Sequence, residues 1–141
     1  MVVGVTLVGF AVLTRSARAM DVASLSDAEA MSLGVRLNRL RTVLFLAATV
    51  LAAGAVVLAG PIAFVGLIAP HLARLALGPR HGPLLIGAAL IGAGLVVAAD
   101  TVSALLALKL GIGRMPIGIF TAMLGGPAFL WMLRPHLGRS L

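Results

Sequence analysis

The residues with the most definite local chemistry are the S-D-A-E sequence at 26–29, which is typical of a capping box at the start of a helix. The side chain of Ser26 is expected to accept a hydrogen bond from the Glu29 N–H group, while Glu29 reaches back to the Ser26 N–H. Gly34 can adopt the left-handed conformation that ends a helix. We therefore predict a short helix from Ser26 to about Leu33, whose chemistry is structural and not catalytic.

No arrangement of residues in the sequence predicts catalysis, and we expect no metal ion and no cofactor. The sequence lacks a glycine-rich phosphate loop of the Walker type, so we expect ATP hydrolysis to require another protein. No His, Asp and Glu residues have metal-ligand spacing, and the histidines at 71, 81 and 136 fall at segment boundaries, where snorkelling or capping is expected. Asp100 is a functional candidate if it lies at membrane depth. Its position before Thr101 favours a helix-capping role instead.

The composition predicts an all-α, polytopic membrane protein. Of the 141 residues, 61% are hydrophobic and 11% are charged, whereas soluble domains carry about 25% charged residues. The net charge of +7 is divided among segments between apolar runs, which argues against nucleic-acid binding. The absence of cysteine excludes disulfides and thiol chemistry.

Apolar runs predict about four full membrane spans, at 42–59, 61–77, 84–99 and 115–133. The run at 1–13 would be about 20 Å long as a helix, against about 30 Å of hydrocarbon. A signal peptide is disfavoured because no positive charge precedes this run. We therefore expect a truncated first span, in a chain that is a fragment, a split gene product or the result of a mispredicted start.

The polar segment 14–41 separates the first two apolar runs and holds five of the eleven Lys and Arg residues. If 61–77 crosses the membrane, this segment shares one side with the turn 78–83 and the C-terminal tail. With Arg74, near the end of 61–77, that side carries nine Lys and Arg against two. If 61–77 is re-entrant, the split is seven against four. The first arrangement places 14–41 in the cytoplasm. There it either docks a soluble partner or only fixes orientation, and composition favours the second interpretation.

Small residues four apart predict helix-packing faces. They are Gly118, Ala122 and Gly126 in the last run, and Gly92 with Ala88 in the preceding one. Such faces indicate packing within the subunit, a subunit interface or the lining of a pathway. At this level transporter, channel and passive membrane subunit all remain open.

Three stretches together resemble the FecCD/BtuC-type permeases, the membrane subunits of ABC importers for iron–siderophores, haem and cobalamin. They are A-S-L-S-D-A-E-A-M-S-L-G-V at 23–35, G-P-I-A-F-V-G-L-I-A-P-H-L-A-R at 60–74, and M-P-I-G-I-F-T-A-M-L-G-G-P-A-F-L-W-M-L at 115–133. The second stretch is the most specific to the family. The resemblance covers nearly the whole chain and corresponds to the C-terminal portion of these permeases.

The resemblance implies a multi-pass protein of the bacterial inner membrane that imports an iron–siderophore-type substrate and is not itself an enzyme. It implies three partners: a cytoplasmic ABC ATPase, a second permease subunit, and a periplasmic or lipid-anchored binding protein. The loop that couples transport to the ATPase would include Arg18, Ser26, Asp27, Glu29, Leu33 and Gly34.

The segment 100–116 departs from the family pattern. Ala104 stands where family members often have arginine, and Arg114 precedes Met115-Pro116 where they have an acid. Lys109 or Arg114 is the candidate for docking the binding protein. The alternative function is a non-transporting remnant or passive membrane subunit. The substrate is not determined by the sequence.

Overall fold

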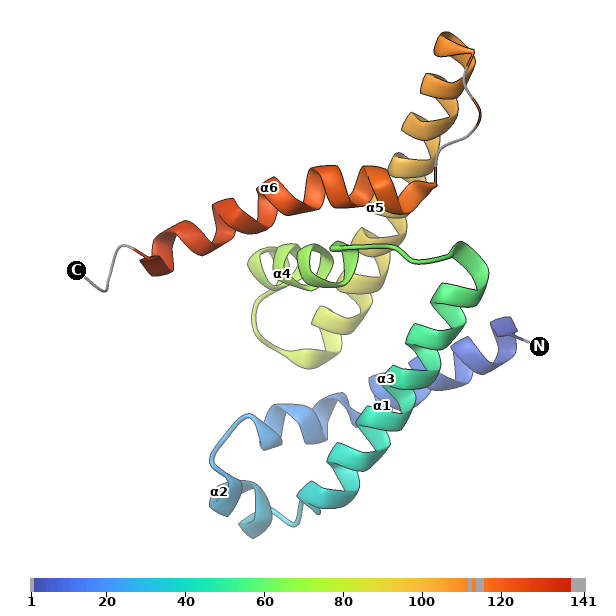
Figure 1. Cartoon of the computed structure of the whole chain (residues 1–141). Helices are drawn as coiled ribbons and strands as arrows, with labels where there is room; N and C mark the ends of the chain where they lie inside the picture. The colour runs from blue at the N-terminus through green and yellow to red at the C-terminus, as the bar shows by residue number, and fades with distance from the viewer. Residues whose placement is uncertain (1, 112, 114–115, 138–141) are drawn as a thin grey trace. The chain divides into compact units, whose positions relative to one another are not determined.

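The computed structural model describes residues 2–111, 113 and 116–137, apart from the side chains of 124, 128 and 131–137. Helices are the only regular secondary structure among these residues (Figure 1), which confirms the all-α class. The helices are α1 (Val2–Ala23), α2 (Asp27–Ser32), α3 (Leu37–Ala59), α4 (Val65–Leu77), α5 (His81–Leu110) and α6 (Ile117–Leu137). Among the described residues, α1, α3 and α5 are long and apolar enough to cross a membrane, whereas α4 and residues 117–127 of α6 are apolar but shorter.

The first helix is longer than its apolar run predicts. We expected the polar segment to begin at Thr14, but α1 continues to Ala23. The hydroxyl groups of Thr14 and Ser16 donate to backbone carbonyls one turn earlier, at 3.1 and 2.8 Å, so these side chains are satisfied within the helix. No glycine or proline interrupts this stretch. The helix is therefore longer than the predicted 13-residue run, because its 22 residues extend about 33 Å.

The starts of α4 and α3 also differ from the predicted boundaries, each for its own reason. The chain leaves α3 at Gly60, with a φ of 75°, and Phe64 has a φ of 64°, so α4 begins only at Val65 and not at residue 61. Its 13 residues extend about 20 Å, which is shorter than the expected span. At the start of α3 the helix begins at Leu37 instead of residue 42, because polar side chains are tolerated in an exposed first turn.

Asp100 lies inside a helix, so the capping role predicted for it is wrong. Helix α5 runs for 30 residues and ends before Gly111, whose φ is 63°. Past Pro83 in its first turn, no proline interrupts α5, and the change from apolar to mixed composition near residue 100 does not break it.

The described chain divides into two compact units, residues 1–60 with 77–86 and residues 61–76 with 87–141. In the first unit α1 and α3 form an antiparallel hairpin that α2 closes (Figure 1). A Cβ atom on Gly9 would lie 3.2 Å from Leu51 Cγ, and one on Gly54 would lie 3.1 Å from Thr6 Oγ1. Glycine therefore allows the two helices their close approach.

In the second unit α6 packs through a stripe that differs from the predicted one. A Cβ atom on Gly118 would collide with the carbonyl oxygen of Pro61, and one on Gly125 would lie 2.6 Å from Phe64 Cγ. By contrast, a Cβ atom on Gly126 would have no neighbour within 4 Å. A step of seven residues returns to within about 20° of the same helix face, whereas a step of eight rotates by about 80°.

The remaining predicted packing residues are half-buried. Ala122 lies one residue after the buried Thr121 in α6. Gly92 of α5 lies in the second unit, where a Cβ atom on it would be 3.5 Å from the Cβ atom of Ala69 in α4. This is ordinary van der Waals contact, so Gly92 tolerates a small side chain better than Gly125.

Adjacent glycines of α6 therefore provide a matched test of packing. We expect Gly125→Ala to destabilise the protein by about 1–3 kcal/mol, because the new methyl group overpacks against Phe64, whose ring centroid lies 6.2 Å from that of Phe129. Gly126→Ala should leave stability unchanged. Thermal unfolding of the detergent-purified variants measures the difference, and equal midpoints for the two variants would contradict the observed register of α6.

Candidate functional site

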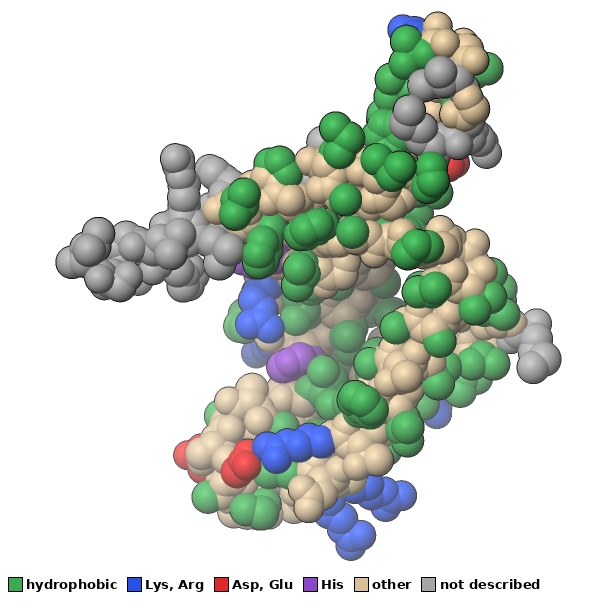
Figure 2. All heavy atoms as spheres, viewed as in Figure 1, with side chains coloured by type: hydrophobic (Ala, Val, Ile, Leu, Met, Phe, Trp, Pro, Cys, Tyr) green, Lys and Arg blue, Asp and Glu red, His purple; other side chains and the backbone are tan. Residues whose placement is uncertain are grey.

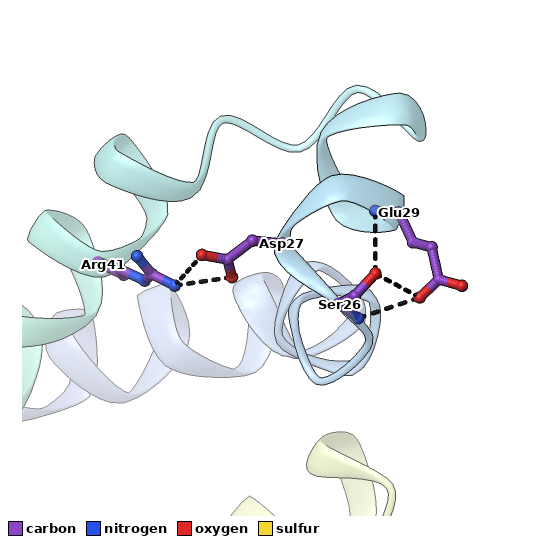
Figure 3. A network of polar contacts seen from close by, with 4 residues as sticks. All are labelled: Ser26, Asp27, Glu29 and Arg41. Atoms are coloured by element: carbon purple, nitrogen blue, oxygen red, sulfur yellow. Dashed lines mark hydrogen bonds and ion pairs between the residues drawn. The ribbon is translucent and has the colours of Figure 1, made fainter.

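The polar segment between α1 and α3 contains the predicted capped helix, now resolved as α2 (Figure 3). Ser26 is the N-cap, with an extended backbone, and its Oγ atom accepts a hydrogen bond from the Glu29 N–H at 3.3 Å. Glu29 Oε2 in turn accepts from the Ser26 N–H at 3.1 Å and from the Ser26 hydroxyl at 2.7 Å. The capping box predicted from the sequence is thus confirmed.

These hydrogen bonds, first from the Ser26 hydroxyl and then from its N–H group, hold the pKa of Glu29 below its ordinary value of 4.5. A lowered carboxyl pKa means that the ionised form is favoured in the folded protein. The cap is therefore fully formed above that ordinary value and is lost as the pH falls through the lowered one. At neutral pH the start of α2 is fully capped.

The C-terminal end of α2 is closed by a Schellman motif. Gly34 has a φ of 82°, its N–H donates to the Met31 carbonyl at 3.0 Å, and the Val35 N–H donates to the Ala30 carbonyl at 3.1 Å. The left-handed role predicted for Gly34 is confirmed, and the C-cap is Leu33, as the predicted helix end implied. Both ends of a six-residue helix are thereby satisfied without help from another element.

Two contacts tie α2 to the hairpin. The Ala30 side chain is fully buried, and Arg41 Nη2 of α3 lies 3.0 and 3.2 Å from the two carboxylate oxygens of Asp27 (Figure 3). The side chains of this ion pair are 62% and 60% exposed, so it contributes at most about 1 kcal/mol. The shape of α2 therefore depends mainly on its own caps.

The outer surface of this site is apolar. Leu25, Met31 and Leu33 are 52%, 59% and 64% exposed, although they lie in the most polar segment of the chain. Exposed apolar side chains on a rigid, locally capped helix form a surface suited to binding another protein. The sequence prediction included only Leu33 among these three.

The predicted residue Arg18 lies outside α2, exposed on the last turns of α1. Lys109 occupies the last turn of α5 and is exposed, whereas Arg114 lies outside the described residues. Across the part of the chain that the structure describes, no group of three His, Cys, Asp or Glu side chains could hold a metal ion.

One polar contact near this site was missed by the sequence prediction. Asp21 Oδ1, in the last turn of α1, accepts from the backbone N–H of His81 at 2.8 Å, and the Nδ1 atom of His81 lies 2.7 Å from the same oxygen. His81 is the first residue of α5, so Asp21 satisfies an N–H that the helix itself leaves free. Sixty residues separate the partners, and only the proposed topology, with both segments on one side, pointed toward this contact.

Comparison with known proteins places these features in a family. The model of the FecCD transport family matches residues 1–135. The cobalamin import system permease protein BtuC of Halobacterium salinarum is 44% identical over 137 residues, which cover 97% of this chain and 36% of the relative. Two further relatives, the hemin transport system permease protein HmuU of Yersinia pestis and the iron(3+)-hydroxamate import system permease protein FhuG of Bacillus subtilis, are each 42% identical over 117 residues, 83% of this chain and 34% of theirs. The chain spans about a third of the length of these relatives.

The junction of α1 with α5 predicts a disulfide cross-link. A Cβ atom on Gly82 would lie 4.0 Å from the Cβ atom of Ala17, within the range of about 3.5–4.5 Å that disulfides require. Because the chain has no native cysteine, oxidised Ala17→Cys/Gly82→Cys protein should lose both reactive thiols, counted by coupling to maleimide–polyethylene glycol. In the control Gly4→Cys/Gly82→Cys, the first cysteine lies about 20 Å further along α1, and both thiols should stay reactive. Two free thiols in the Ala17 variant after oxidation would contradict the junction.

Proposed function

The chain belongs to the FecCD transport family, and we propose that it is part of a permease subunit of a binding-protein-dependent ABC importer. The similar proteins named above are permease proteins of import or transport systems, and three described helices are suited to crossing a membrane. In this proposal the chain supplies membrane helices and a coupling element, and a separate subunit hydrolyses ATP.

The observation that carries the proposal is the capped helix α2. Its two ends are closed by hydrogen bonds within residues 26–35, and it presents the exposed side chains of Leu25, Met31 and Leu33. Capping contributes on the order of 1 kcal/mol, which is enough to preorganise a docking helix but not to hold a membrane protein together. We propose that α2 inserts into a cytoplasmic ABC ATPase and transmits its closure to the membrane helices.

The proposal requires α2 to face the cytoplasm. This orientation is supported by the distribution of Lys and Arg, with nine on the side of α2 and two on the other side in the proposed topology. The hydrogen bonds between Asp21 and His81 give independent support, because they require the end of α1 and the start of α5 to lie on the same side. That condition is met if α4 with residues 60–64 returns the chain across the membrane, and it is not met by the re-entrant alternative.

Further partners follow from the family. We propose a second permease subunit as one, with Gly126 and Ala122 of α6 as candidate contacts, since Gly126 has open space within this chain. A binding protein on the outer side would meet Lys109 and Arg114. The substrate we propose is a metal chelate of the iron–siderophore type, which agrees with the hemin and iron–hydroxamate named for two relatives.

Removing the capping interactions at both ends of α2 tests the coupling role. In the complete transporter, Ser26→Ala/Gly34→Val eliminates the capping hydroxyl and forces a β-branched residue into the left-handed conformation, a combined cost of about 2–3 kcal/mol. We expect membrane insertion to be unchanged and the apparent affinity for the ATPase to fall roughly tenfold or more. ATPase co-purification and substrate uptake, measured in parallel, report the effect.

A matched control keeps the local chemistry. Ser24→Ala/Gly34→Asn removes a serine hydroxyl outside the capping box and retains a residue that tolerates the left-handed conformation. It should preserve uptake and ATPase binding. If the Ser26→Ala/Gly34→Val protein also keeps both at the unmutated level, the segment 14–41 serves only to orient the chain.

A further inference from the structure

A second surface of the first unit lies between the two membrane helices and not on α2. It is a groove of about 350 Å³ between the last turns of α1 and the first turns of α3. Its lining residues come from α1, from the link after α2 and from α3: Ser16, Ala19, Gly34, Val35, Arg36, Arg39, Leu40 and Val43. We call it the α1–α3 groove.

The α1–α3 groove has two arginines and no acidic residue in its lining. Arg36 and Arg39 are both exposed and line it, and no carboxylate does. Arg15 lies one helical turn before the lining residue Ala19, so it borders the same face of α1. A neighbouring groove of about 530 Å³ shares Arg36 but also contains the Arg41–Asp27 ion pair. Arg39 lines only the α1–α3 groove of these two, where no carboxylate faces it.

The part of the α1–α3 groove that lies further along α3 is apolar. Leu40 and Val43 continue the lining into α3, and Ala19 and Val35 complete it. Helices α1 and α3 both have the length and hydropathy of membrane spans. Arg36 precedes the first turn of α3 and Val43 lies about 10 Å further along the axis, so the groove passes from polar to apolar over the depth of a lipid headgroup region. Figure 2 shows Lys and Arg side chains gathered at the end of α3 that adjoins α2.

We propose that the α1–α3 groove binds an anionic phospholipid of the adjoining leaflet, with its phosphate between Arg36 and Arg39 and the start of an acyl chain along Leu40 and Val43. A basic pocket between membrane helices is the recognised setting for anionic headgroups. A free phosphate would make no use of the apolar end, and an acidic protein would not reach the depth of Val43. The proposal does not depend on ATPase docking, which uses the exposed side chains of Leu25, Met31 and Leu33.

Native mass spectrometry of the purified chain with added phosphatidylglycerol or phosphatidylcholine of identical acyl chains tests this proposal. The unmutated protein should retain phosphatidylglycerol preferentially. Each interfacial arginine contributes about fivefold to anionic-lipid binding, so Arg36→Gln/Arg39→Gln should lower that preference by about 30-fold. Should the double variant fail to fold, as judged by circular dichroism, either single variant should still show a loss of about fivefold.

The matched control is Arg74→Gln/Arg80→Gln, which removes two exposed arginines outside the groove. It should keep the preference for phosphatidylglycerol, because the net charge changes equally but the groove does not. Equal retention of the two lipids by the unmutated chain would overturn the proposal. So would an equal loss in both variants, or displacement of the lipid by millimolar inorganic phosphate, which would identify a general anion site. No ATPase is present, so failure here leaves the coupling proposal intact.

Discussion

The hydrogen bonds that Asp21 accepts from His81 restrict the rest of this chain. A helix begins with N–H groups that have no partner inside it, and at the start of α5 the partner is a carboxylate from the end of α1. The contact holds together two segments that are far apart in sequence. In the proposed topology the chain crosses the membrane through α3 and returns through α4, so that α2 and the turn before α5 share one side.

The way α2 is attached to the hairpin bears on how it could transmit motion. The helix is small, and its ties to the hairpin are a buried alanine and one exposed ion pair. Its shape comes from the capping box and the Schellman motif, which are independent of the surrounding membrane helices. A partner that moves α2 would therefore move a preformed element, and the displacement would pass to the ends of α1 and α3 without first having to order the loop.

The parts of the structure that could be predicted are those determined by neighbours in sequence. Ser26, Glu29 and Gly34 lie within nine consecutive residues, so the S-x-x-E spacing and the following glycine were sufficient to predict α2. The helix boundaries that we predicted from changes of polarity, at Thr14 and at Asp100, were wrong. Hydroxyl groups bond back to the helix carbonyls, and an exposed or paired charge does not end a helix, whereas glycine with positive φ does.

Features that depend on tertiary contact were beyond the sequence. The partnership of Asp21 with His81 joins residues sixty positions apart. The choice of Gly125 instead of Gly126 depends on where Phe64 meets α6, and the spacing of small residues alone did not predict that contact. Apolar side chains such as those of Leu25, Met31 and Leu33 could equally belong to a core. Only their exposure in the structure indicates a surface that another protein could contact.

Hydrogen exchange in the assembled transporter, with and without its ATPase, tests the central claim most directly. If α2 is the docking element, the backbone amides of Ala30, Leu33, Gly34 and Val35, which already donate within the capped helix, should exchange more slowly when the ATPase is bound. Amides at the end of α5, near Lys109, should be unchanged because the proposed topology places them on the other side of the membrane. Unaltered exchange throughout 26–35 on ATPase binding would contradict the account.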